Sequence, residues 1–133
     1  MTLFICEIDR KNQVIHWVNA GHDPAMIYDC ESGHFEELAG NALPLGVSEM
    51  TAYQKSDKKI IAGQIIIMGT DGIWETQNPK GEMFGKERFK DIIRENGDRP
   101  AKDIAQTVID EVDRFCHPLE KTDDVTLVVT KIT

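Results

Sequence analysis

Residues 65–75, IIIMGTDGIWE, join a continuous apolar run to an Asp-Gly pair. The run from residue 64 to residue 70 is short and bounded by glycines, which is typical of a strand covered on both faces. Such a strand would place the carboxylate of Asp71 at the rim of a sheet. The arrangement therefore raises the question of what a carboxylate does at that position.

The part of the chain before this run is rich in predicted strands. Residues 3–8 and 13–19 are apolar segments joined by a polar turn, which predicts a hairpin. Residues 25–29 and 35–38 form a second pair, joined by a segment that contains Ser-Gly. These four segments predict an antiparallel meander.

The remaining segments predict a layered domain. Residues 41–47 contain Pro and Gly and predict a loop, and residues 51–60 alternate as a half-exposed strand does. Residues 85–96 and 99–117 carry apolar stripes at helical spacing, so we expect two helices lying on a sheet. Residues 123–132 predict a last strand, apolar enough for the interior of a sheet. The order favours an α+β domain with mostly antiparallel pairing.

Composition limits the class of protein. The 133 residues suffice for one domain with a core of its own, and 41% hydrophobic with 29% charged residues is ordinary for a globular protein. Fifteen basic against 23 acidic residues give a net charge of -8. Because this charge repels phosphate backbones and anionic lipid surfaces, we expect neither nucleic acid nor a membrane as partner.

The cysteines and the hydropathy indicate a cytoplasmic location. Cys6, Cys30 and Cys116 are widely spaced and show no zinc-site pattern, so we expect buried free thiols. No apolar stretch approaches the roughly 20 residues that a membrane span needs. The chain also opens without the basic and apolar regions of a signal peptide.

Two acidic segments are candidates for chemistry. Asp71 precedes Gly72, for which we expect a positive φ and a sharp turn beneath the carboxylate; the same pair is also common in tight hairpin turns. Asp123 and Asp124 precede the last strand, where charges often serve only to prevent edge aggregation. Acids at the tips of two neighbouring strands can, however, converge on one cation.

Oxygen ligands of this kind suit Mg²⁺ or Mn²⁺, which retain several waters and need no histidine. A pair of such ions would make the site that of a phosphoryl hydrolase. His22, in NAGHDP, is a candidate general acid, although a histidine in a Gly-Pro turn also serves as a local hydrogen-bonding or packing residue.

Four ordered motifs resemble one family. NAGHDPAMIYD, ALPLGV, IIIMGTDGIWETQNPKGEMFGKERF and DDVTLVV occur here in the order found in bacterial SpoIIE-type phosphatases, which are similar to metal-dependent phosphatases of the protein phosphatase 2C-like superfamily. The resemblance implies an αββα sandwich of two antiparallel sheets flanked by helices, with two Mn²⁺ or Mg²⁺ ions at one end. By motif match, Asp71 and Asp123 would bind metal and Asp124 would hold the site by hydrogen bonding.

The resemblance also implies an activity and a partner. The family reaction is hydrolysis of phosphoserine or phosphothreonine on a protein by metal-activated water, and this branch commonly acts on phosphorylated anti-anti-sigma proteins. The family places a further Asp-Gly segment and two helices ahead of residues 1–8, and nothing in this sequence matches them. We therefore expect residues 1–133 to form a single domain, truncated relative to the family, with an incomplete metal site and no activity of its own.

Two alternatives remain at this point. The chain would also suit a noncatalytic phosphatase-like module that binds a signalling partner. A missing layer would, in addition, expose apolar surface and unpaired strand edges, which promote self-association.

Overall fold

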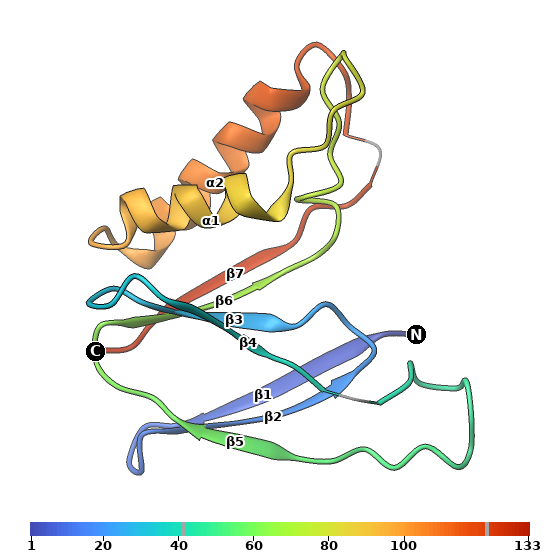
Figure 1. Cartoon of the computed structure of the whole chain (residues 1–133), viewed down its shortest axis with the longest axis vertical. Helices are drawn as coiled ribbons and strands as arrows, with labels where there is room; N and C mark the ends of the chain where they lie inside the picture. The colour runs from blue at the N-terminus through green and yellow to red at the C-terminus, as the bar shows by residue number, and fades with distance from the viewer. Residues whose placement is uncertain (41, 122) are drawn as a thin grey trace.

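The computed structural model describes residues 1–40, 42–121 and 123–133, and in them the chain forms seven strands and two helices. Figure 1 shows three layers: a small sheet, a second sheet stacked on it, and a pair of helices on the far side of the second sheet. The expected α+β architecture with two antiparallel sheets is confirmed. Within the described residues, no helix covers the outer face of the small sheet.

The small sheet contains β1 (Leu3–Asp9), β2 (Val14–Ala20) and β5 (Ser56–Lys59), in the order β1-β2-β5. Strands β1 and β2 form the predicted hairpin, with seven paired positions. The strand expected over residues 51–60 is shorter than predicted, because only four of its residues pair with β2.

The second sheet contains β3 (Ala25–Asp29), β4 (Phe35–Leu38), β6 (Gln64–Gly69) and β7 (Leu127–Lys131), in the order β4-β3-β6-β7. All neighbouring strands are antiparallel. The predicted loop is confirmed over residues 42–47, which include no strand; Asn41 lies outside the described residues.

The position of β7 differs from the prediction. We expected the last strand inside the sheet, but β7 is an edge strand with β6 as its neighbour, and Val128 is 45% exposed. The alternating apolar pattern reports that both faces of a strand are covered in part, and it carries no information on whether both of its edges are hydrogen-bonded.

Strand β6 is buried on both faces, as predicted. Ile66 packs between the two sheets with Ile15 and Ile27, whereas Ile65 and Ile67 face the helices, and each of the three β6 isoleucines is 0% exposed. Burial of each side chain contributes about 1.5 to 3 kcal/mol to folding. The strand that ends just before Asp71 is therefore firmly held between the two layers that cover it.

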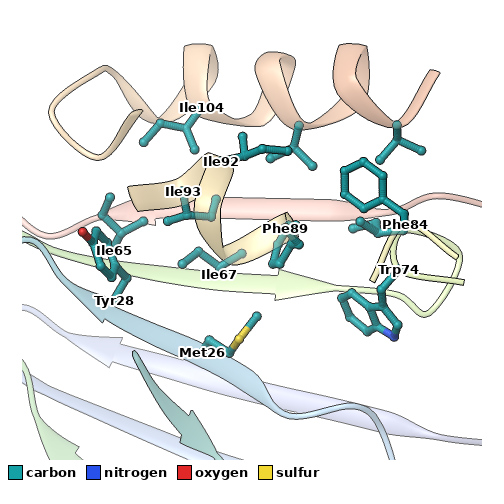
Figure 2. Packing of buried hydrophobic residues seen from close by; sticks show 13 residues of the cluster. Met26, Tyr28, Ile65, Ile67, Trp74, Phe84, Phe89, Ile92, Ile93 and Ile104 are labelled. Atoms are coloured by element: carbon teal, nitrogen blue, oxygen red, sulfur yellow. The ribbon is translucent and has the colours of Figure 1, made fainter. Parts of the chain in front are cut away.

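Both predicted helices are confirmed. Helix α1 (Lys86–Asn96) turns Phe89, Ile92 and Ile93 toward the sheet, and α2 (Ala101–Cys116) packs beside it. Figure 2 shows these side chains meeting those of β3 and β6 in one apolar layer.

The predicted free thiols are confirmed, but they are not all buried. Cys116 is buried, Cys6 is half-buried and Cys30 is exposed, because Cys30 follows β3 in a surface turn. Neither helix in the described residues is long and apolar enough to span a membrane.

Candidate metal centre

The loop portions of the four sequence motifs lie at one end of the sandwich, called the motif end. Strands β1, β3 and β7 begin there, and β2, β4 and β6 end there, as the antiparallel registers require. In Figure 1 this end carries the N-terminus, whereas the C-terminus lies at the opposite end.

The two aspartate segments are neighbours at the motif end. The β6–β7 ladder finishes with Gly69 opposite Leu127, so Asp71 follows the ladder on one strand and Asp123 precedes it on the other. Beyond the ladder, the Thr70 N–H donates to the Thr126 carbonyl over 3.1 Å. The structure therefore brings together the two segments that the sequence predicted to converge.

Gly72 packs against the backbone of the other aspartate segment. A Cβ atom built on Gly72 would lie 2.3 Å from the carbonyl oxygen of Asp124, closer than any side chain tolerates. Gly72 is absent from the glycines of the described residues that have positive φ, so the expected reason for this glycine was wrong. Its role is to permit a close approach rather than an unusual backbone conformation.

The Asp-Gly pair does not form a two-residue hairpin turn. The Glu75 N–H donates to the Asp71 carbonyl over 2.8 Å, and the Ile73 N–H donates to the Thr70 carbonyl over 3.0 Å. These are helix-like backbone bonds, and they lead the chain toward α1. The hairpin alternative for Asp71 is thus wrong.

The carboxylates themselves are accessible. Asp71, Asp123 and Asp124 are all exposed, and the Asp123 carboxylate accepts the N–H of Asp124 over 2.8 Å. A surface depression of about 530 Å³ lies beside Asp123 and Asp124. Water and a ligand can therefore reach these oxygens.

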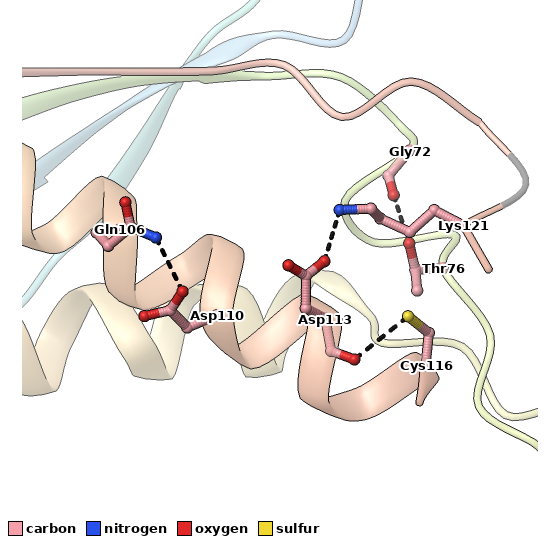
Figure 3. A network of polar contacts seen from close by, with 7 residues as sticks. All are labelled: Gly72, Thr76, Gln106, Asp110, Asp113, Cys116 and Lys121. Carbon is pink, nitrogen blue, oxygen red and sulfur yellow. Dashed lines mark hydrogen bonds and ion pairs between the residues drawn. The ribbon is translucent and has the colours of Figure 1, made fainter. Parts of the chain in front are cut away.

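An ion pair holds the segment before β7 on α2. Figure 3 shows Lys121 reaching from this segment to Asp113, with 2.5 Å between the Lys121 Nζ and the Asp113 carboxylate. In the same view, the Thr76 hydroxyl donates to the Gly72 carbonyl over 2.6 Å and closes the turn after Asp71. Each aspartate segment is thus attached to the body of the domain as well as to its neighbour.

The donor chemistry fits Mg²⁺ or Mn²⁺, because both ions favour carboxylate oxygens together with water. In residues 1–40, 42–121 and 123–133, however, no group of three or more His, Cys, Asp or Glu side chains is arranged to hold a metal ion.

His22 occupies the β2–β3 loop at the motif end. Its backbone N–H donates to the side-chain oxygen of Asn19, and its carbonyl accepts from the Asn19 amide, each over 2.9 Å. The His22 Nδ1 lies 3.2 Å from the Thr2 hydroxyl. These contacts fit the local hydrogen-bonding role that the turn sequence also allowed.

The β2–β3 loop is attached to its neighbours at the same end. A Cβ atom on Gly21 would lie 2.7 Å from the ring of Pro44, so the NAGH and LPLG motifs are in tight contact. Asp23 pairs with Lys86 at 3.4 Å, and the Lys86 ammonium lies 4.8 Å from the centre of the Trp74 ring. The first helix and the β2–β3 loop therefore meet beside the Asp71 segment.

Sequence reasoning missed Thr70 and Asn19. Thr70 directly follows β6 and precedes Asp71, and Asn19 lies near the end of β2, three residues before His22; this proximity to a selected residue was the available signal. Their hydrogen bonds cross between segments, which a one-dimensional pattern does not reveal.

Comparison with known proteins gives concordant results. The family model described as Stage II sporulation protein E (SpoIIE) matches residues 1–133. Phosphoserine phosphatase RsbU of Bacillus subtilis is 23% identical over 131 residues, which are 98% of this chain and 38% of RsbU.

Solved structures show the same fold. The SiaA-PP2C domain of Pseudomonas aeruginosa has a TM-score of 0.85 at 20% identity, covering 99% of this chain and 52% of that chain. The phosphatase domain of SpoIIE from Bacillus subtilis, presoaked with Mn, has a TM-score of 0.73 at 21% identity, covering 98% of this chain and 56% of that chain. This chain thus spans about half the length of these domains and under two fifths of RsbU. With a family model matched along its entire length, the chain belongs to the Stage II sporulation protein E (SpoIIE) family.

Proposed function

We propose that this chain forms part of a metal-dependent protein serine/threonine phosphatase. The observation that carries the proposal is the meeting of the Asp71 and Asp123 segments at the end of β6 and β7, with Gly72 in contact with the Asp124 backbone. The family membership supports the same reading, because RsbU is described as a phosphoserine phosphatase.

In this proposal, Asp71 and Asp123 are metal ligands and Mn²⁺ or Mg²⁺ is the cofactor. Asp124 supports the site by donating its N–H to the Asp123 carboxylate. Ligands beyond these two would come from water and from protein outside the described residues. When bound, the ions would lower the pKa of a water molecule and neutralise charge on the phosphoryl group.

The residues of this chain have defined tasks in that reaction. The backbone bond from the Thr70 N–H to the Thr126 carbonyl, together with the bond from the Thr126 N–H to the Thr70 hydroxyl, holds the two carboxylate-bearing segments together. Because the carboxylates are exposed, ions bound to them would remain in contact with water, as a hydrolytic reaction requires. The absence of a side chain at Gly72 allows the Asp124 backbone to approach the turn after Asp71.

The proposed substrate is a phosphorylated bacterial signalling protein of the anti-anti-sigma type, dephosphorylated at serine or threonine. Support for a phosphoserine substrate comes from RsbU, and support for the fold from SiaA-PP2C. The net charge of -8 makes contact with a nucleic acid unfavourable.

The test is phosphate release from a phosphoserine protein substrate by the protein that carries this chain, with Mn²⁺ present. We expect Asp71→Asn and Asp123→Asn each to lower turnover by more than the ~100-fold that loss of a supporting partner of a metal ligand causes. Asp98→Asn is the matched control, because it removes the same charge from the segment between the two helices, away from the motif end.

The outcomes of this test distinguish a phosphatase from a noncatalytic phosphatase-like module. Turnover that persists in both aspartate variants would contradict the ligand assignment. A wild-type protein that binds the phosphoprotein but releases no phosphate would instead support the noncatalytic phosphatase-like module.

A further inference from the structure

We infer that Thr70 is the positioning residue of this site, because its hydroxyl fixes the separation between the segments that carry Asp71 and Asp123. The inference rests on the proposed function, since the separation matters for metal binding only if those aspartates are ligands. Thr70 is not itself a ligand in this account; it acts through its neighbours.

The Thr70 hydroxyl makes two hydrogen bonds to the opposite segment. It accepts the N–H of Thr126 over 3.0 Å and donates to the carbonyl of Asp124 over 3.2 Å. A hydroxyl offers one donor and two acceptor sites, so a single side chain serves both groups. We refer to this pair of bonds as the hydroxyl bridge.

The hydroxyl bridge takes the place of a backbone bond. In a continued antiparallel ladder, the Thr126 N–H would donate to the Thr70 carbonyl. Here that carbonyl instead accepts the N–H of Ile73, which opens the turn that carries Asp71. The side chain of Thr70 therefore keeps β7 attached while its backbone turns away.

The hydroxyl bridge and Gly72 both affect the distance between the Asp124 carbonyl and the segment that carries Asp71. Gly72 allows the Asp124 carbonyl to approach, because a Cβ atom there would leave only 2.3 Å. Thr70 holds that carbonyl at the approached position. Since Asp71 follows Thr70 directly and Asp123 precedes Asp124 directly, a shift of the hydroxyl bridge would move both carboxylates relative to each other.

The experiment compares Thr70→Val with Thr70→Ser in the protein that carries this chain. Valine keeps the shape of the side chain and removes the hydroxyl, whereas serine keeps the hydroxyl. We expect Thr70→Val to weaken Mn²⁺ binding, measured by titration calorimetry, by about 10-fold to 100-fold. We expect Thr70→Ser to remain within about 3-fold of the wild type, because serine offers the same donor and acceptors.

A second measurement reports the hydroxyl bridge without metal. Hydrogen exchange at the Thr126 amide should accelerate in Thr70→Val and stay slow in Thr70→Ser. The Mn²⁺ concentration for half-maximal turnover should rise in Thr70→Val, by the same factor as the dissociation constant. A merely structural role would lower thermal stability and leave that concentration unchanged. Thr70→Ala provides the same readouts should Thr70→Val not fold.

The outcomes are distinguishable. Equal Mn²⁺ affinity in folded Thr70→Val and in the wild type would overturn the inference and leave the proposed function standing. Equal losses of Mn²⁺ affinity in Thr70→Ser and Thr70→Val would also overturn the inference. A wild-type protein that binds no Mn²⁺ would overturn the proposed function, and this inference with it.

Discussion

Aspartates stand at both ends of the sandwich, and the two ends use them differently. At the end opposite the motif end, the Asp9 carboxylate accepts the N–H groups of Lys11 and Asn12 and the Asn12 side-chain amide, and so closes the β1–β2 turn. At the motif end, backbone groups close the turn after Asp71, through the Glu75 N–H and the Asp71 carbonyl.

Asp29 repeats the pattern of Asp9 in the β3–β4 turn. Its carboxylate accepts the N–H groups of Glu31 and Ser32, the Ser32 hydroxyl and the Gln64 amide. Donation by the Ser32 N–H is the chief reason that the pKa of Asp29 is below its ordinary value. Where the carboxylate closes the turn, it accepts several hydrogen bonds; where backbone groups close the turn after Asp71, the Asp71 carboxylate remains exposed.

The largest expected effect on stability comes from replacing one glycine at each end of the sandwich by alanine. Gly72→Ala would place a Cβ atom 2.3 Å from the carbonyl oxygen of Asp124, a backbone atom that cannot rotate away as the end of a flexible side chain can, so we expect a loss of about 3 kcal/mol in the free energy of unfolding. Gly33→Ala at the opposite end has open space and only a φ of +71° to disfavour it, for a loss of about 1 kcal/mol.

Urea unfolding of both glycine variants measures the difference. Equal losses of unfolding free energy in Gly72→Ala and Gly33→Ala would show that the close contact between Gly72 and Asp124 does not set the motif end apart. A large loss in Gly72→Ala together with weaker Mn²⁺ binding would extend the contrast from stability to the site.

The next largest effect on stability is expected from replacing one asparagine at each end by alanine. Asn19 is 5% exposed and bonds both backbone groups of His22, so Asn19→Ala leaves a partly buried donor and acceptor without these partners and should cost about 2 kcal/mol. Asn12 at the opposite end is exposed, and Asn12→Ala should cost under about 1 kcal/mol because water replaces its bond to Asp9. Thermal unfolding of the two variants checks the order, and a larger cost for Asn12→Ala would contradict it.

The pH dependence of stability gives the smallest effect. Hydrogen bonds, chiefly from the Asn12 N–H to Asp9 and the Ser32 N–H to Asp29, hold the pKa of each carboxyl below its ordinary value. Their stabilisation is present above the unfolded-state pKa of roughly 3.9 and is lost as the pH falls through the lower folded-state pKa.

We therefore expect the wild type to lose stability more steeply than Asp9→Asn/Asp29→Asn as the pH falls from about 5 to about 2. Urea unfolding across that pH range measures both slopes. Parallel slopes would show that these two carboxyls are not engaged as the structure places them.

The sequence was most informative where periodicity reports packing. The stripe of Phe89, Ile92 and Ile93 identified α1, and the apolar run before Asp71 identified β6, because burial of one or both faces imposes a repeat on the residues. It was least informative for strand edges. The edge position of β7 depends on which strand lies beside it, and no periodicity within β7 encodes that neighbour.

The meeting of the two aspartate segments was predictable from the sequence, whereas the hydrogen bonds between them were not. Two acids at the tips of apolar strands indicated Asp71 and Asp123, since strand ends collect at the rim of a sheet. The hydroxyl bridge of Thr70 and the contact of Gly72 with Asp124 depend on the register of β6 against β7, which the sequence does not specify. The positive φ expected at Gly72 was wrong for the same reason.

The most direct test of the metal site is anomalous diffraction from crystals of the protein that carries this chain, soaked in Mn²⁺. The account predicts a manganese peak at the motif end, with oxygens of Asp71 and Asp123 at roughly the 2.0–2.2 Å of hard-cation ligation. A peak bonded to neither aspartate, or carboxylates directed away from each other, would contradict it.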